Sequence, residues 1–367
     1  MTTEAGWASL PTPAAVVDVT RLDANVAEMA DRMAASGVAL RPHFKTSKCL
    51  QVARRQLAAG AVGMTCSTPA EVTVLAENGI TGSLWAHQPV GPAKVDFAVR
   101  AVRGWQTLLL ADSVAVARPL SNALAAAGVE AELMLEVNTG HARTGVDPDR
   151  AVATAREIDA LPGLRVRGVV THEGHLAGHP DRAERERHGR ETSALLVSVA
   201  ESLRAQGIAA DAVSVGSTPG ASSTPFVAGV TEARPGTYVY FDANQLRLGS
   251  CTPEQCALTV LATVVSAERP GTVIVDAGVK AMSSDTITPE TGVGLVWDLT
   301  GRPMPDVAFT TANEEHGFLT GAGTAGLRVG DRLRLLPNHA CGTVNMWSQV
   351  FAWDGTGYEE WPILARH

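Results

Sequence analysis

The sequence lacks several features that would place it in a specialised class of protein. Aromatic residues are only 5% of the 367 residues, so the chain has little with which to stack the bases of single-stranded nucleic acid. The formal net charge is -8 and the Lys and Arg residues form no basic patch, so we expect no nucleic-acid partner. No apolar run approaches membrane-spanning length, so we expect no membrane partner. The N-terminal stretch MTTEAGWASLPTP has no basic region followed by an apolar core, so we expect no secretory signal.

Cysteine is also scarce. The five cysteines are scattered and odd in number, which favours reduced thiols in a cytoplasm over a disulfide framework. What is present is the composition of a soluble globular protein, with 45% hydrophobic and 19% charged residues. A chain of this length can bury a sizeable core, and its length predicts two domains or one barrel with an addition.

The order of the expected elements indicates a barrel. From about Val38 to Asp242, eight short apolar runs alternate with helix-like segments rich in Ala, Leu, Glu and Arg. Continuous apolar strands that alternate with amphipathic helices are typical of parallel strands covered on both faces. Eight of them predict an α/β protein with a (β/α)8 barrel of the TIM type. The alternative is an open doubly wound sheet, which is weaker because no G-x-G-x-x-G follows an early strand.

The pattern changes after about Leu246. Later runs such as CALTVLATVVSAE and GTVIVDAG are β-rich, with turn residues between them. They predict an antiparallel β domain over residues 246–367, after a barrel domain over residues 1–245. An early strand, AAVVDV, precedes the barrel and is a candidate member of the β domain.

Five polar segments lie where strands of the predicted barrel end. In a barrel the carboxyl ends of all strands meet at one mouth, so we expect these segments to surround one site. They are RPHFKTSK with Lys45, NTGHARTG with Arg143, THEGH with His172, VGSTPG with Ser217 and Thr218, and TEARPGTY with Arg234, Gly236 and Thr237.

These residue types together suit one cofactor. A partly desolvated lysine near other cations can act as an amine nucleophile. Backbone N–H groups and hydroxyls at a Gly-Ser-Thr sequence suit an anion such as a phosphate, and the late loops of barrels commonly bind one. A lysine, a phosphate cradle, an arginine and a histidine beside a ring indicate a pyridoxal phosphate site.

The order of the motifs resembles that of a known family. RPHFKTSK, RTGV, GSTP, TEARPGTYVYFD, DAGVKAMSSD, EEHG and PNHACGTVN occur in the order typical of the alanine racemase-like (fold-type III) pyridoxal phosphate enzymes. Within that family the chain resembles the branch of D-serine dehydratase and D-threonine aldolase. The resemblance runs from about Pro11 to Arg366.

The resemblance implies roles for the residues at the strand ends. Lys45 would bind the cofactor covalently and, when released, serve as the catalytic base. Arg143 would donate to the cofactor's phenolic oxygen, and His172 would lie against its ring. Arg234 matches an arginine at the pyridine nitrogen, which would leave that nitrogen unprotonated and the ring a poorer electron sink. The phosphate would be held by Ser217, Thr218, Gly236 and Thr237.

A candidate metal pair lies in PNHACGTVN. His339 and Cys341 are two residues apart, and on a strand such residues point to the same face. The branch resembles enzymes with a divalent metal at this position, where two protein ligands leave places for water and substrate. Dehydratase-like members have a cysteine where aldolase-like members have an acidic residue. A thiolate favours zinc, whereas a carboxylate suits manganese or magnesium.

The function implied is a pyridoxal phosphate-dependent, metal-assisted lyase that acts on a small D-3-hydroxy amino acid. The favoured reaction is dehydration of a D-serine- or D-threonine-like substrate to a 2-oxo acid and ammonia. One alternative is retro-aldol cleavage to glycine and an aldehyde. Another is an amino-acid racemase, although the chain offers only three tyrosines for that role. A non-catalytic cofactor carrier is disfavoured by the β domain.

Some positions depart from the family or stay open. Ser47 stands where the family has a histidine, and HLAGHPD after Glu173 differs from the aromatic-bearing version in D-serine dehydratases. Glu314–His316 are expected either beside the site of this chain or its partner, or in a charged turn. The resemblance also implies a homodimer that pairs barrel with β domain.

Overall fold

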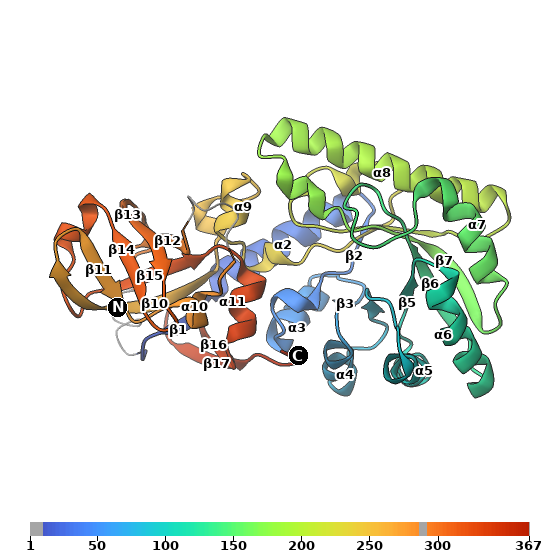
Figure 1. Ribbon diagram of the computed structural model, residues 1–367, viewed down its shortest axis with the longest axis horizontal. Coiled ribbons are helices and arrows are strands. Elements are labelled where there is room, and N and C mark those ends of the chain that lie inside the picture. Colours follow the sequence, from blue (N-terminus) through green and yellow to red (C-terminus); the bar gives the residue numbers. More distant parts are fainter. Residues whose placement is uncertain (1–9, 286–291, 367) are drawn as a thin grey trace. The chain divides into compact units, whose positions relative to one another are not determined.

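The protein is described by a computed structural model over residues 10–285 and 292–366 (Figure 1). The described residues divide into two compact units. The barrel unit comprises Glu28–Lys45 and Val52–Gly236, and the β unit comprises residues 10–27, Thr46–Gln51 and Thr237–Arg366. The first nine residues of the stretch inspected for a secretory signal lie outside the described residues. Across the described ranges, no helix has the length and apolar character needed to cross a membrane.

Eight parallel strands form the barrel unit, which confirms the predicted (β/α)8 barrel. Six of them make one sheet in the order β2-β9-β8-β7-β6-β5, and β3 pairs with β4. Isolated parallel bridges from His43 to Thr65 and from Leu84 to Leu108 join these two sets into a closed ring. The strands are β2 (Ala39–Leu40), β3 (Thr65–Cys66), β4 (Leu84–Trp85), β5 (Leu109–Ala111), β6 (Ala131–Glu136), β7 (Leu164–Val170), β8 (Ala212–Val215) and β9 (Glu232–Ala233).

Helices follow the strands and begin at recognisable capping residues. The side chains of Thr68, Ser113 and Asp181 accept hydrogen bonds from the first turns of α4, α6 and α8. Figure 1 shows α4–α8 on the outside of the barrel strands. The helices are α2 (Val19–Ala35), α3 (Leu50–Ala58), α4 (Pro69–Glu77), α5 (Pro92–Trp105), α6 (Val114–Ala127), α7 (Pro148–Asp159) and α8 (Arg182–Ala205). Because the eight barrel strands are parallel, their carboxyl ends all lie at the same mouth.

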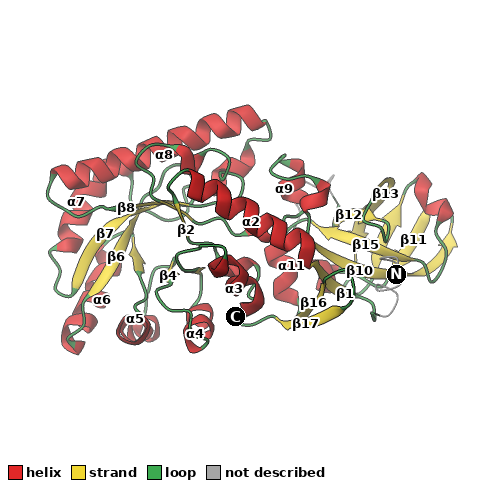
Figure 2. Ribbon diagram, turned by 180° about the vertical axis from the view of Figure 1, so that it is seen from behind, coloured by secondary structure: helices red, strands yellow, loops and turns green. Residues whose placement is uncertain are grey.

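The β unit is built on a nine-stranded sheet, which confirms the predicted antiparallel β domain. Its order is β11-β14-β13-β12-β15-β10-β1-β16-β17, and β10 also pairs with β11, so that β10 to β15 close on themselves. Figure 2 shows these strands in yellow. The strands are β1 (Ala14–Asp18), β10 (Leu258–Arg269), β11 (Thr272–Val275), β12 (Gly294–Trp297), β13 (Pro303–Ala312), β14 (Gly317–Thr320), β15 (Arg332–Pro337), β16 (Gln349–Trp353) and β17 (Tyr358–Pro362).

The core of the β unit is made of aliphatic side chains from these strands. Val260, Ala262 and Val264 alternate along β10 and are fully buried, together with Leu335 on the neighbouring β15. Besides the first half of α2, the unit contains three short helices: α9 (Ala243–Arg247), α10 (Val279–Met282) and α11 (Ala340–Met346). α9 follows directly on TEARPGTYVYFD, and α11 begins within PNHACGTVN.

The early strand β1 belongs to the β unit. It runs antiparallel to β10 and parallel to β16, with Val16 opposite Thr259 on one side and Phe351 on the other. The contacts divide the chain between Gly236 and Thr237, somewhat before the boundary expected between residues 245 and 246. The chain therefore enters the β unit before, within and after the barrel.

Candidate functional site

Lys45 lies in a short 3₁₀ turn, Phe44–Thr46, that follows β2. Within the described part of the chain, its ammonium group has no hydrogen-bond or ion-pair partner. The other two cations of RPHFKTSK are tied to structure. Arg41 forms an ion pair with Glu232 at 2.7 Å, and the Lys48 ammonium donates to Asn345 Oδ1 at 2.9 Å and to the carbonyl of Ala365 at 2.9 Å. Lys45 is thus the cation in this segment that remains available for chemistry.

His172 is held as a neutral imidazole in the barrel unit. Its Nδ1 donates to the carbonyl of Gly216 at 2.7 Å, which leaves Nε2 with the lone pair. Burial, the nearby charge of Lys45 and the charges of Arg143 and Arg234 together lower the pKa of His172 to about 3. Lys45, Arg143 and Arg234 are therefore close enough to His172 for their charges to act on its ring.

Arg143 follows β6 and is exposed, at the edge of a pocket in the barrel unit. Glu136, His141, Thr171 and His172 line the same pocket. The pocket joins the carboxyl ends of β6 and β7, the position expected for Arg143 and His172. His43 also lies in this region, and burial followed by the charge of Lys45 lowers its pKa.

The loop after β8, Gly216–Gly220, is packed too closely for larger residues at its glycines. A Cβ on Gly216 would lie 2.8 Å from the Cβ of Arg234, and one on Gly220 would lie 2.9 Å from Ser217 Oγ. Ser217 Oγ accepts from the N–H of Gly220 at 3.0 Å. Backbone N–H groups and hydroxyls in such a tight loop have the chemistry that a phosphate needs.

Thr218, Arg234 and Gly236 complete the expected barrel residues. Thr218 is buried in the loop after β8. Arg234 is only 5% exposed; its Nε donates to Ser214 Oγ at 2.8 Å, and its Nη2 donates to the carbonyl of Thr171. These bonds fix the guanidinium plane. Gly236 is the last residue of the barrel unit, and Thr237 is the first of the β unit.

Glu173 is a buried acid that the sequence analysis did not assign. Its Oε2 accepts from the N–H of Gly216 at 2.9 Å, and burial raises its pKa. Glu173 therefore stabilises the loop that follows β8 through its hydrogen bond with Gly216. It stands beside His172 in THEGH, and an acid next to a predicted site residue was the signal that could have identified it.

The metal pair lies at a helix start, so the expectation that it lies on a strand is wrong. β15 ends at Pro337, His339 has extended backbone, and Cys341 is in the first turn of α11. Proline cannot donate in a sheet ladder, and the N–H groups of the new helix need acceptors. The two side chains are nevertheless close enough for Cys341 to act on the pKa of His339.

Asp242 lies next to the His339 ring, and the sequence analysis did not identify it as a site residue. It is fully buried at the start of α9; its Oδ2 accepts from the N–H of Ala340 at 2.9 Å and lies 3.3 Å from His339 Nδ1. A carboxylate on Nδ1 orients the ring and leaves Nε2 for a metal. Burial would lower the pKa of His339, but Cys341 and Asp242 raise it to about 11. The donor set of imidazole, thiolate and supporting carboxylate fits a divalent cation such as zinc.

Two threonines, Thr46 and Thr237, lie near the Cys341 thiol and are adjacent in sequence to expected cofactor residues. Thr46 Oγ1 lies 3.1 Å from Cys341 Sγ, and Thr237 Oγ1 lies 3.8 Å from it. Thr46 follows Lys45 in sequence, and Thr237 follows Gly236. The neighbour of Lys45 and one expected phosphate ligand, Thr237, thus lie beside the Cys341 thiol.

The positions left open by the sequence are now located. Ser47 is buried, 2% exposed. Glu314 and Glu315 are exposed and pair with the Lys280 ammonium at 3.0 and 2.9 Å, and His316 is also exposed. Glu314–His316 are thus an exposed, charged segment of the β unit that leads into β14 at the buried Gly317.

Comparison with known proteins gives two family domains that follow one another along the chain. The family of the alanine racemase N-terminal domain matches residues 17–244, and that of the serine dehydratase domain matches residues 257–353. D-threo-3-hydroxyaspartate dehydratase of Delftia sp. (strain HT23) is 40% identical, over 94% of this chain and 98% of the relative. D-threonine aldolase of Arthrobacter sp. is 32% identical, over 98% of this chain and 93% of the relative.

The fold comparison gives the same family. The solved structure of the Delftia dehydratase superposes with a TM-score of 0.93 at 38% identity, over 98% of this chain and 99% of that chain. Another structure of that dehydratase, with a cysteine replaced by alanine, is a metal-free form. This chain therefore belongs to the alanine racemase-like (fold-type III) pyridoxal phosphate enzymes, in the lyase branch that includes D-threo-3-hydroxyaspartate dehydratase and D-threonine aldolase.

Proposed function

We propose that the protein is a metal-assisted, pyridoxal phosphate-dependent dehydratase of D-3-hydroxy amino acids. It would convert its substrate to a 2-oxo acid and ammonia. The observation that carries the proposal is the pair His339 and Cys341 with the buried Asp242 behind it, because a racemase or a cofactor carrier has no use for this metal-ligating group. The Delftia relative, which is named for a dehydration, supports the same reaction class.

The cofactor would be held by residues at the barrel mouth. Lys45 would bind it covalently, with Arg143 at the phenolic oxygen, His172 against the ring and Arg234 at the pyridine nitrogen. The phosphate would be held by Ser217, Thr218, Gly236 and Thr237. When bound, pyridoxal phosphate draws electron density from the α-carbon of the substrate, and a metal polarises the β-hydroxyl.

The chain's own residues would then manage the protons. Lys45, which has no structural partner among the described residues, is the proposed acceptor of the α-proton. His172 donates through Nδ1 to Gly216, so it presents an uncharged edge rather than a competing cation. Arg234, tied to Ser214 and Thr171, would keep a fixed positive charge at the pyridine nitrogen.

We further propose that the metal is zinc, with manganese or magnesium as alternatives. Imidazole and thiolate are ligands that zinc prefers, and two protein ligands leave positions for water and substrate. Asp242 would set the orientation of His339. A cysteine-to-alanine variant of the Delftia relative is described in a metal-free form, which is consistent with a cysteine ligand in this branch.

The substrate we favour carries a hydroxyl on the β-carbon of a D-amino acid. D-Serine, D-threonine and D-threo-3-hydroxyaspartate belong to this class, and the last is the substrate named for the 40% identical relative. Ser47 and the HLAGHPD segment depart from the family pattern, so all three are substrates to be assayed. We also propose a homodimer, by resemblance to other enzymes of this fold.

A product assay tests the function. Purified protein would be given each D-3-hydroxy amino acid and D-alanine, and ammonia, aldehyde, glycine and isomer would be measured. We expect ammonia and a 2-oxo acid, lost on chelation with the cofactor absorbance unchanged, and restored by zinc. Glycine with an aldehyde would instead show the aldolase reaction, and turnover at the original rate after chelation would exclude the metal.

Two variants at one position sharpen the test. Cys341→Ala should lose the reaction and not recover with zinc, because one of the two ligands is gone. Cys341→Asp supplies a harder ligand and should move the metal preference towards manganese. Cys49→Ala changes a cysteine outside the pair and should keep zinc dependence unchanged.

A further inference from the structure

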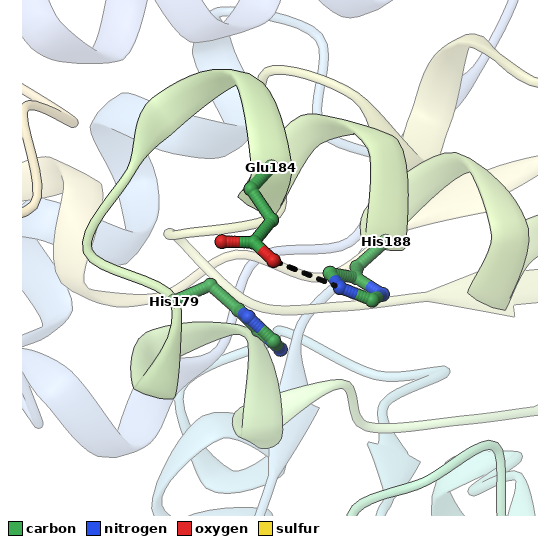
Figure 3. Close-up of side chains that lie close together, drawn as sticks. All are labelled: His179, Glu184 and His188. Carbon is green, nitrogen blue, oxygen red and sulfur yellow. Dashed lines mark ion pairs between the residues drawn. The ribbon is translucent and has the colours of Figure 1, made fainter.

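A second group of metal-ligating side chains, besides His339 and Cys341, lies in the barrel unit. His179, Glu184 and His188 each direct a ligating atom towards the others, and these atoms all lie within 4.8 Å of one another. Figure 3 shows Glu184 and His188 on the first turns of α8 and His179 on the segment that precedes it. His179 and His188 are half-buried, and Glu184 is exposed.

The local sequence holds the three side chains in place. Glu184 and His188 are four residues apart on a helix, so they share one face. Asp181 caps this helix by accepting from the N–H of Glu184 at 2.8 Å. The buried Arg185 donates to the carbonyl of His179 at 2.9 Å, which ties the preceding segment to α8. The Arg185 side chain thus fixes the backbone of His179 next to α8.

The present contacts of the cluster are weak enough to give way to an ion. The rings of His179 and His188 are stacked with centroids 4.2 Å apart, and Glu184 Oε1 lies 3.8 Å from His188 Nε2. Arg187 Nη2 lies 3.0 Å from His188 Nε2, and Glu191 Oε2 lies 3.3 Å from His188 Nδ1. Arg187 and Glu191 also pair with each other at 2.7 Å and can keep that contact. Tetrahedral ligands on bonds of about 2.0 Å are about 3.3 Å apart, so rotations of partly exposed rings would close the set.

We propose that His179, Glu184 and His188 form a second divalent metal site of the zinc class, independent of the catalytic pair. Two imidazoles and one carboxylate are borderline ligands that suit zinc better than magnesium or calcium, which prefer oxygen. Three protein ligands leave a fourth position for water. The ion would fasten the segment Gly174–Asp181 to α8.

At this location the ion would act on the segment that follows His172 and Glu173. The segment that it would fasten begins one residue after Glu173, whose carboxyl supports the Gly216 loop, and two residues after His172. His175 in the same segment also meets α8, with Nε2 3.4 Å from Thr192 Oγ1. Occupancy of the site would therefore stiffen the connection between β7 and α8.

Zinc titration of the full-length, cofactor-loaded protein tests the proposal. Cys341→Ala serves as the background, because it removes a ligand from the other pair. In the presence of excess Mg²⁺, we expect one zinc ion per chain. Adding His179→Ala or His188→Ala should weaken this binding by about tenfold or more, since one of three ligands is lost. Adding His87→Ala, an exposed histidine outside the cluster, should leave it unchanged.

A direct measurement covers the case in which a variant misfolds. Crystals of the Cys341→Ala protein soaked in zinc should show an anomalous peak at the zinc edge between the three side chains. A Cys341→Ala protein that binds no zinc would overturn the proposal. So would equal binding after both histidines are replaced, or a peak elsewhere with none at α8.

Discussion

Two buried carboxyl groups, Glu173 and Asp242, show how single residues support the proposed chemistry. Neither would touch the substrate. Glu173 accepts from the backbone of the β8 loop, and Asp242 accepts from the start of α11 and faces His339. Each is thus a positioning residue, and each can be tested by a change that keeps its shape.

Asp242→Asn should weaken metal binding by about 10–100-fold, because an amide supports the His339 ring less well than a carboxylate. The loss should appear in a zinc titration that follows the activity. Cofactor absorbance should persist, since no expected cofactor ligand is changed. Asp211→Asn, at an exposed acid, is the matched control and should bind zinc normally. Unchanged zinc affinity in Asp242→Asn would remove Asp242 from the metal site.

Glu173→Gln should change how stability depends on pH. Burial raises the folded-state pKa of this carboxyl, so its contribution to stability is present below the unfolded value of 4.5 and is lost as pH rises through the folded value. Glutamine does not titrate and can still accept from Gly216. Thermal midpoints measured from about pH 4.5 to about pH 8 should therefore fall more for wild type than for the variant. Glu201→Gln, an exposed control, should follow wild type, and parallel profiles for all three would refute the prediction.

Lys45→Ala should abolish the near-visible absorbance of the covalently bound cofactor and reduce turnover by about 100-fold or more. The reason is that Lys45 is both the proposed attachment point and the proposed base. Borohydride reduction followed by peptide mapping should mark Lys45 in wild type. Lys280→Ala, which changes an exposed lysine paired with Glu314, should behave as wild type. A mark on Lys48 or Lys280 would show that the attachment point is misassigned.

At the scale of the elements, the barrel depends on close approach between β7 and β8. Gly168 on β7 lies opposite Ala212 on β8, and a Cβ added there would lie 2.0 Å from the carbonyl oxygen of Ala212. The strands must therefore separate to accept any side chain. Because His172 and Glu173 follow β7, such a shift would also disturb the proposed site.

Gly168→Ala should destabilise the protein by about 1–3 kcal/mol, or more if the strands cannot adjust. Gly104→Ala is a matched control on α5, where an added Cβ meets nothing within 4 Å. That change should stabilise by about 0.5–1 kcal/mol, because alanine loses less backbone freedom on folding than glycine. Thermal unfolding monitored by circular dichroism would give both values. If Gly168→Ala and Gly104→Ala changed the stability equally, the close approach of β7 and β8 would be contradicted.

At the scale of the whole molecule, the β unit is not a simple C-terminal domain. Its sheet takes β1 from the beginning of the chain, between β10 and β16. Without β1, both neighbours would lose a hydrogen-bonded strand, and β16 with β17 would be cut off from the rest of the sheet. An unpaired buried ladder is costly.

A fragment of residues 246–367 should therefore aggregate or remain unfolded. The same fragment with residues 10–27 joined by a flexible linker should recover β-sheet structure, because β1 is then available. Circular dichroism and a cooperative thermal transition would distinguish the two. A folded, cooperative fragment without β1 would show that the strand is dispensable.

Several features could be predicted from the residues alone. The eight apolar runs, each followed by a helical pattern, predicted the barrel, because period and turn chemistry are local properties. The strand-end positions of Lys45, Arg143 and His172 followed from the same pattern, since all carboxyl ends of a closed parallel barrel share one mouth. The H-x-C spacing and the order of motifs likewise lie in the sequence itself.

Other features were decided only by tertiary structure. Which of three cations in RPHFKTSK is free of structural bonds depends on Glu232 and Asn345, far along the chain. The support of His339 by Asp242, and of Gly216 by Glu173, joins residues whose spacing carries no pattern. The metal pair was expected on a strand but lies at a helix start, because Pro337 ends β15 and Asp242 caps the turn that follows. Burial and long-range hydrogen bonds fixed these points, and neither is visible to a reading of neighbouring residues.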